Sequence, residues 1–180
     1  MTEIKRKDLP LNTSMTFFEC ILNEPEMNQQ IIKVIDEQGD RQKNNTYVKA
    51  QMTEWFMAEK PGFNKLANMC IDISKKISFE KHNVQVRPVI KDMWGLKYKS
   101  NEVTGRHDHW PASWSFTYYI NPPKDAPGLF FPEMGEQGGE RKLEPGLLLF
   151  FPGYILHEVR EKKFKGYRYT VTGNIYIYEK

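Results

Sequence analysis

In the first part of the chain, hydrophobic residues recur mainly with the spacing of an α-helix. A dense apolar run at 15–22 predicts a short strand. Apolar residues then recur every three or four positions between Asn23, a candidate cap, and Gly39, a candidate stop, and again over 63–77. This spacing predicts two amphipathic helices. The segment 47–57 fits a strand in its first half and neither period in its second.

From residue 84 onward the period becomes that of strands. Alternating or compact apolar runs, several of them bounded by glycine and proline, occupy 84–86, 94–98, 114–119, 128–131, 146–151 and 167–178. Such runs are typical of a closed or sandwiched sheet, which the two earlier helices would brace. Glycines and charges fill 133–145, which we expect to be a mobile loop and a candidate lid.

The final predicted strand, 167–178, separates its residues into two faces. One face is mostly apolar: Tyr167, Tyr169, Val171, Gly173, Ile175 and Ile177. The other carries a polar row: Arg168, Thr170, Thr172, Asn174, Tyr176 and Tyr178. If this row points into a barrel, Arg168 and Thr170 form the floor of a ligand pocket. The alternative is a surface pair bound to a neighbouring acid.

Three of the four histidines gather in the same half of the chain, at His107, His109 and His157. In an extended strand, residues two positions apart point the same way, so His107 and His109 can reach one ion together. Neutral imidazole is the commonest protein ligand for transition metals, and a third, distant histidine makes this a candidate metal site. Asp108 would face away, unless the strand is already ending there.

Composition narrows the class of protein without naming an activity. The chain has 180 residues, 39% of them hydrophobic, which fits one domain with a real core. A net charge of +3 does not require a polyanionic partner, so a nucleic acid is not indicated. No segment has the length and hydropathy of a membrane span or a signal peptide. Cys20 and Cys70 lack metal-type spacing and indicate reduced thiols, so we expect a soluble, cytoplasmic protein.

Three of these motifs together resemble the Fe(II)- and 2-oxoglutarate-dependent oxygenases. The motifs are His107-X-His109, His157 after an apolar strand, and Arg168-X-Thr170 eleven residues later. The resemblance covers roughly 84–177 and is greatest to small bacterial and viral members that are similar to prolyl hydroxylases. It implies a mainly β fold, the double-stranded β-helix, or jelly roll, of cupin-like proteins, with supporting N-terminal helices.

The resemblance also implies an assignment of sites within one domain, 1–180. Its first part, 1–82, would hold a strand and the supporting helices, and 83–180 the double-stranded β-helix with the metal site. His107, His109 and His157 would bind Fe(II) as the catalytic centre. The cosubstrate 2-oxoglutarate would be bound by Arg168, Thr170 and Tyr119, with Tyr118 as the alternative to Tyr119. Trp110 and Trp114 would wall the cavity.

One position departs from the pattern of this family. Most members have a carboxylate where this chain has His109, so the site would contain three histidines, as in some cupin dioxygenases. Asp108 is the alternative ligand, if the backbone twists at the strand end. A three-histidine site carries one negative charge less, which bears on iron affinity and on reactivity.

The expected activity is therefore dioxygenation, in which 2-oxoglutarate and O2 are consumed and a substrate is hydroxylated. The substrate is left open between a protein or peptide side chain, such as proline, and a small molecule. Two alternatives remain: a cupin-like three-histidine metalloenzyme without 2-oxoglutarate, and a non-catalytic jelly-roll binding module with structural histidines.

Overall fold

The computed structural model describes residues 16–41, 46–134 and 139–179. Within these residues, two helices and nine strands follow one another. In order they are β1 (Phe18–Ile21), α1 (Pro25–Gln38), β2 (Val48–Lys49), β3 (Gln51–Met52), α2 (Phe63–His82), β4 (Val86–Tyr98), β5 (Val103–His107), β6 (Trp114–Tyr119), a 3-10 turn (Pro132–Met134), β7 (Leu147–Pro152), β8 (His157–Val159) and β9 (Arg168–Glu179).

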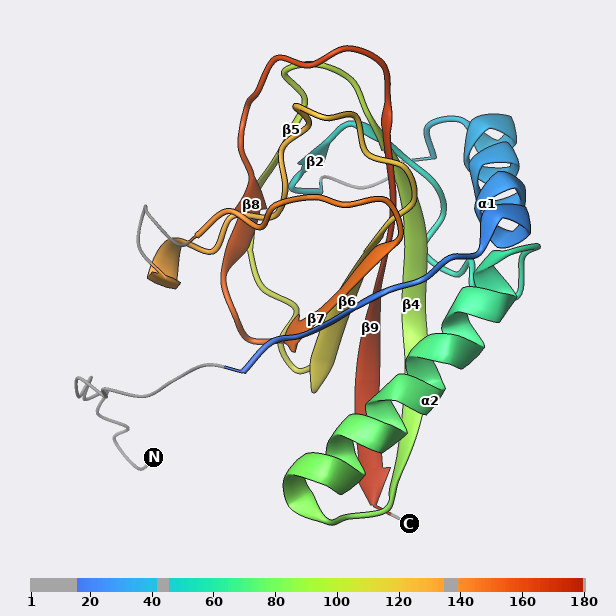
Figure 1. Ribbon diagram of the computed structural model, residues 1–180, viewed down its shortest axis with the longest axis vertical. Helices are drawn as coiled ribbons and strands as arrows, with labels where there is room; N and C mark the ends of the chain where they lie inside the picture. Colours follow the sequence, from blue (N-terminus) through green and yellow to red (C-terminus); the bar gives the residue numbers. More distant parts are fainter. Residues whose placement is uncertain (1–15, 42–45, 135–138, 180) are drawn as a thin grey trace, which may run out of the picture.

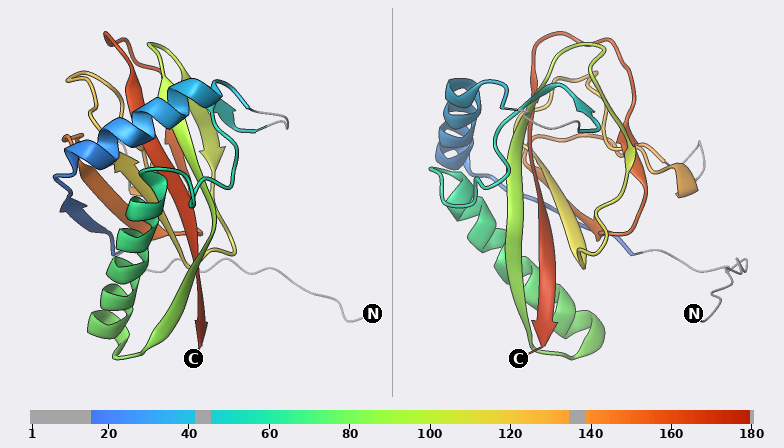
Figure 2. Two further views of the ribbon diagram at one scale, coloured as in Figure 1. Left: turned by 90° about the vertical axis from the view of Figure 1, so that its right-hand side faces the viewer. Right: turned by 180° about the vertical axis from the view of Figure 1, so that it is seen from behind.

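The strands form two antiparallel sheets. The larger has the order β1-β7-β6-β9-β4-β3 and the smaller the order β2-β5-β8. Both helices cover one face of the larger sheet, and the smaller sheet lies on its other side (Figures 1 and 2). The architecture is thus a mainly β sandwich with a helical layer, as the hydrophobic pattern predicted. We call the face toward the helices the outer face, and the face toward the smaller sheet the inner face.

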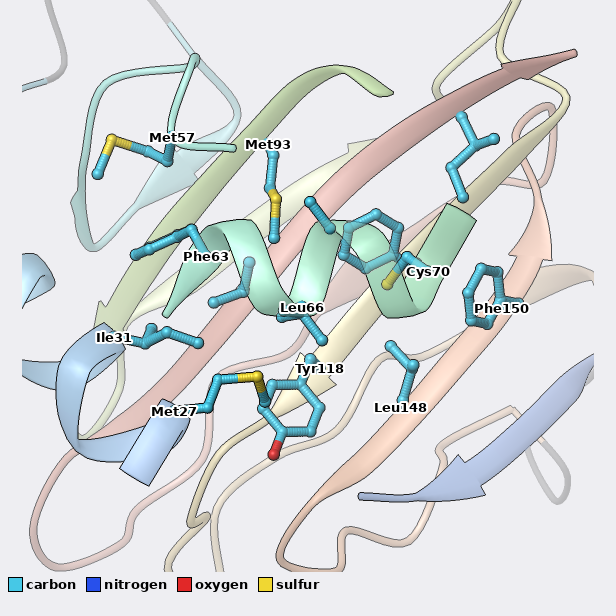
Figure 3. Packing of buried hydrophobic residues seen from close by; sticks show 14 of the residues in the cluster. Met27, Ile31, Met57, Phe63, Leu66, Cys70, Met93, Tyr118, Leu148 and Phe150 are labelled. Carbon is cyan, nitrogen blue, oxygen red and sulfur yellow. The ribbon is translucent and has the colours of Figure 1, made fainter. Parts of the chain in front are cut away.

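A helical layer and an apolar outer face form the first of two cores. Phe63, Leu66 and Cys70 of α2 are completely buried against the sheet, where they join Leu148 and Phe150 of β7 in one cluster (Figure 3). A second cluster, which includes residues of β2, β4, β7 and β8, fills the space between the two sheets. Burial of both cores supplies the main free energy of folding.

The first helix begins and ends almost where its sequence signals predicted. Pro25 occupies its first turn, and Gly39 follows its last residue with a φ of 64°, a conformation that glycine adopts without strain. The predicted cap was wrong: the N-cap residue is Glu24 rather than Asn23, and its side chain makes no capping hydrogen bond. The second predicted helix is confirmed and extends to His82.

Two strand predictions required correction. Val86, the last residue of the run at 84–86, begins the same strand, β4, that contains 94–98, and this strand continues through Pro88. At Pro88 the described pairing is with β9 alone, so β4 is an edge strand there, where proline is tolerated. The first half of the segment 47–57 forms β2 and β3, in agreement with its strand-like alternation, and its second half forms no named strand. The run at 128–131 contributes only isolated bridges at Phe130.

The structure bears on two expectations, the absence of a membrane span and the reduced state of the cysteines. Neither helix in the described residues combines the length and the hydropathy that a bilayer crossing requires. Both cysteines are free thiols, with Cys70 buried and Cys20 partly buried. Burial raises the pKa of the Cys70 thiol well above its usual value, so it stays protonated at neutral pH.

Candidate metal centre

Three histidines converge between the two sheets. His107 ends β5 and His157 begins β8, and the two residues face each other as partners of that antiparallel pair. His109 follows β5 by two residues and is fixed by its backbone N–H, which donates to the carbonyl of Gly153 at 2.6 Å. The ligating nitrogens of the three imidazoles lie within 4.8 Å of one another. One ion can therefore contact all three.

The hydrogen bonds of two histidines leave the same ring nitrogen free on each. His107 Nδ1 lies 2.8 Å from the carbonyl of Gly105, and His157 Nδ1 lies 2.9 Å from the carbonyl of Ile155. A carbonyl only accepts, so each Nδ1 carries the proton and each Nε2 presents a lone pair. His109 Nε2 is buried and has no hydrogen-bond partner among the described residues. This arrangement fits metal ligation, in which the second ring nitrogen donates to the protein.

Burial keeps these imidazoles neutral. Desolvation lowers the pKa of His109 to about 2, with a further contribution from the two neighbouring histidines, and lowers that of His157 to about 3. It also lowers the pKa of His107. A neutral imidazole is the form that binds a transition metal, so no proton has to leave at pH 7. Three nitrogen donors suit iron, zinc, copper or nickel.

Aromatic rings surround the histidines. The Tyr47 ring stacks on His107 with centroids 5.3 Å apart, and Phe151 contacts His157 edge-on at 4.9 Å. The Trp94 ring lies 5.8 Å from that of His109. These contacts fix the orientations of the imidazole rings, which an ion needs for a defined geometry.

Asp108 lies outside this cluster. Its side chain is exposed, and its Oδ1 accepts a hydrogen bond from the backbone N–H of Trp110 at 3.1 Å. The geometry therefore brings the imidazole of His109, rather than the carboxylate of Asp108, to the other two histidines.

A buried arginine faces the same interior. Arg168 is 2% exposed, donates from Nη1 to the carbonyl of Pro127, and stacks 3.9 Å from the centre of the Tyr98 ring. Among the described residues, its Nε and the hydroxyl of Thr170 are buried without hydrogen-bond partners, and no carboxylate forms an ion pair with Arg168. An unpaired buried cation is costly, which favours an anionic ligand at this place.

Tyr119 completes this pocket from β6. It is fully buried, its hydroxyl accepts a hydrogen bond from the backbone N–H of Leu129 at 3.1 Å, and the Arg168 guanidinium lies 5.9 Å from its ring. Burial raises the pKa of Tyr119 to about 12, although the nearby cation opposes this. The phenol therefore keeps its proton and can donate it to a ligand oxygen.

Three other aromatic side chains considered for the site lie elsewhere. Trp114 and Tyr118 belong to the outer-face cluster, and the Tyr118 hydroxyl donates to Asn28 Oδ1 of α1. Trp110 is 76% exposed. The lid expected at 133–145 lies partly outside the described residues, because 135–138 are not among them.

Two inner-face residues were missed by sequence reasoning. Asp92 Oδ1 and Trp94 Nε1 are buried without hydrogen-bond partners among the described residues. The available signal was the alternation Asp92, Trp94, Leu96 and Tyr98, which places a carboxylate on an otherwise aromatic and apolar face.

Comparisons with known proteins support the fold. No protein-family model and no curated protein sequence matches the chain. Among solved structures, a Pseudomonas putida prolyl-4-hydroxylase matches with a TM-score of 0.65 at 15% sequence identity. The match covers 91% of this chain and 93% of the hydroxylase chain. The viral collagen prolyl hydroxylase of Paramecium bursaria Chlorella virus-1, in its 2-oxoglutarate complex, has a TM-score of 0.59 at 16% identity, covering 88% and 94%.

A third neighbour contains a peptide. It is a prolyl hydroxylase from Trichoplax adhaerens in complex with a hypoxia inducible factor fragment, with a TM-score of 0.61 at 16% identity, covering 89% of this chain and 83% of its own. The resemblance to 2-oxoglutarate oxygenases inferred from the motifs is thus confirmed in the fold, while the identities are too low to transfer an activity.

Proposed function

We propose that the protein is an Fe(II)- and 2-oxoglutarate-dependent dioxygenase with a jelly-roll fold, and that it hydroxylates a protein or peptide side chain such as proline. One observation carries this proposal. Three neutral imidazoles converge on a point inside the sandwich, and a buried guanidinium without an acidic partner faces the same interior. A metal and a dianion would satisfy both features together.

The chain's residues have distinct roles in this proposal. The Nε2 atoms of His107 and His157, with a nitrogen of His109, would hold Fe(II), which with 2-oxoglutarate and O2 supplies the oxidising chemistry. Arg168 would bind the far carboxylate of 2-oxoglutarate by a charge-assisted contact. Thr170 and Tyr119 would donate hydrogen bonds to the same group.

The third histidine changes the charge of the site. Three imidazoles leave the full double charge of the ion, whereas two imidazoles and a carboxylate would neutralise one unit. An anionic, chelating cosubstrate is then bound more strongly by the ion itself. The neutral triad therefore supports binding of a keto acid, although it lowers the affinity for the ion alone.

A peptide substrate is supported by the neighbour that was solved with a peptide fragment. The two free thiols, Cys20 and Cys70, support a reducing compartment such as the cytoplasm. Both statements are part of the proposal.

The test uses the purified protein without oxygen. Adding Fe(II) and then 2-oxoglutarate should produce the visible charge-transfer band of the chelate, and admitting air should release succinate. Arg168→Gln is the matched variant: it should still bind the metal but require far more 2-oxoglutarate for the band. If neither band nor succinate appears with the metal fully loaded, the proposal is wrong.

A second candidate is a three-histidine metalloenzyme that does not use 2-oxoglutarate. The absence of a carboxylate among the converging ligands favours it. It predicts metal-dependent activity that survives Arg168→Ala, whereas the leading proposal predicts its loss.

A further inference from the structure

Asp92 is a carboxylate that the proposed chemistry does not use. A bulge at Lys91 in β4 sets its register, so Asp92 lies opposite Asn174 of β9, and Trp94 lies opposite Thr172. Trp94 belongs to the inner cluster, whereas the intervening Met93 belongs to the outer one. By strand alternation the Asp92 side chain is on the inner face, on the metal side.

A hydrogen bond orients Asn174, the residue opposite Asp92, but leaves one oxygen of the Asp92 carboxylate without a partner. Ser115 Oγ donates to Asn174 Oδ1 at 2.8 Å, which turns the amide nitrogen of Asn174 toward other partners. Asn174 lies opposite Asp92 across the strand pair and lowers the pKa of its carboxyl, although the larger effect of burial raises it. Asp92 Oδ1 nevertheless remains buried without a partner among the described residues. The neighbouring Lys91 does not pair with it, because its ammonium lies over the Tyr176 ring at 4.7 Å.

Two tryptophans connect this carboxylate to the surface and to the histidines. The Trp55 ring is 38% exposed and contacts Trp94 edge-on, with centroids 4.7 Å apart. Trp94 is 3% exposed and lies 5.8 Å from His109. A substrate side chain that enters past Trp55 would therefore contact the ring of Trp94 before it reaches the histidines and Asp92.

Asp92 and Arg168 lie at opposite ends of this interior. Arg168 pairs with Tyr98, and Asn174 pairs with Asp92, so six residues separate the two positions on either strand. At about 3.3 Å per residue this is roughly 20 Å of strand. A cosubstrate anchored at Arg168 would leave the Asp92 end for the substrate.

We propose that Asp92, with the Trp55–Trp94 pair, binds a lysine or arginine side chain of the peptide substrate, next to the residue that reaches the metal. This inference rests on the proposed function and adds a requirement for a cation. A cationic head would give Asp92 Oδ1 the charge-assisted donor that it lacks. The aliphatic stem would pack on the tryptophans, which also attract the cation through their ring faces.

The test compares two blocked hexapeptides, one with a proline flanked by two lysines and one with norleucine in place of each lysine. Both are titrated into protein loaded with Mn(II) and 2-oxoglutarate, and binding is followed by tryptophan fluorescence. The wild type should bind the lysine peptide at least about tenfold more tightly. Asp92→Asn should remove this preference and leave affinity for the norleucine peptide unchanged.

Two further variants separate a specific contact from general attraction. Asp125→Asn removes an exposed carboxylate in the loop that precedes Pro127 and should keep the full preference for lysine. Asp92→Lys should bind a matched glutamate peptide better than the lysine peptide. Thermal melts of each variant establish that it is folded.

Several outcomes would overturn the inference. They are equal binding of the two peptides by the wild type, binding of neither, or a lysine preference that survives in Asp92→Asn. Asp92 Oδ1 would then hold only a buried water. If the charge-transfer band and succinate are still produced, the proposed function stands without the cation requirement. Their loss would instead count against the proposed function itself.

Discussion

The two faces of the six-stranded sheet differ in how completely their polar groups are satisfied. The outer face packs against α1 and α2 through apolar side chains such as Val171 and Ile175. Six buried side-chain polar atoms lack hydrogen-bond partners in the described residues, and five of these belong to the inner face or the histidine cluster. The five residues are Asp92, Trp94, His109, Arg168 and Thr170; the sixth is Arg141.

Because of this difference, neighbouring residues of one strand serve either the stability of the fold or the chemistry of the site. In β9, Thr170 faces the interior with an unpaired hydroxyl, while the next residue, Val171, is fully buried in the outer core. Unsatisfied buried groups destabilise a fold, and they are tolerated where a ligand completes them. The outer face therefore supplies the free energy that allows the inner face to remain incomplete.

The largest expected effect is the loss of metal binding on the inner face. His109→Ala should lower Fe(II) affinity by more than the roughly 100-fold that loss of a ligand's hydrogen-bond partner causes, because it removes a ligand itself. Asp108→Ala should keep the metal, since that carboxylate binds the Trp110 N–H instead. Metal stoichiometry after gel filtration measures both. The opposite result would make Asp108 the third ligand.

A substitution in the outer core should damage stability and spare the site. Leu66→Ala removes a completely buried side chain of α2 and should lower the free energy of unfolding by about 2–5 kcal/mol. Lys76→Ala, at an exposed position of the same helix, should change it by less than about 0.5 kcal/mol. Urea denaturation gives both values. Loss of metal binding by folded Leu66→Ala would show that the two faces are coupled.

Replacing the buried cation tests the other end of the inner face. Arg168→Gln should weaken 2-oxoglutarate binding about 100-fold, because a charge-assisted contact in a desolvated pocket is lost. Metal affinity should change little. The concentration of 2-oxoglutarate that gives half of the charge-transfer band measures the effect. A band that is unchanged in Arg168→Gln would place the cosubstrate elsewhere.

The inner face was predictable from sequence where the residues lie close together in the chain. The period of two along β9 predicted that Arg168 and Thr170 share a face, and both are buried there. The His-X-His spacing likewise predicted that His107 and His109 reach one point, and His157 joins them. The pattern along β9 depends only on strand geometry, whereas His109 lies beyond the end of β5 and is held by the hydrogen bond of its backbone N–H to the carbonyl of Gly153.

Features that depend on pairing between distant strands were not predictable. Asp92 faces the interior because a bulge at Lys91 resets the register of β4 against β9. The alternation of Asp92 with Trp94 and Leu96 was a signal for this face, but a bulge leaves no mark in the hydrophobic pattern, so the sequence did not establish where the alternation begins. Tyr118 and Trp114 were misplaced for a related reason, because the helices that cover them lie far away in sequence.

The smallest expected effect is a change in the free energy of unfolding, because the buried Asp92 carboxylate destabilises the fold. Burial raises the pKa of its carboxyl above the usual value, against the opposing hydrogen bonds of Asn174 and the charge of Lys91. The folded protein then binds this proton more tightly than the unfolded chain does. The contribution of Asp92 to stability is therefore most favourable below the unfolded pKa, near 3.9, and is lost as pH rises through the folded pKa.

Asp92→Asn removes this penalty, so the variant should be more stable than the wild type at pH 7, by about 0.5–1 kcal/mol, a small value because the carboxyl is only partly buried. The difference should shrink as pH falls toward 4, where the wild-type carboxyl takes up its proton. Urea denaturation at several pH values measures it. A variant less stable than the wild type at pH 7 would mean that the carboxylate is already paired within the fold. Greater stability together with lost lysine preference would instead identify a residue retained for binding.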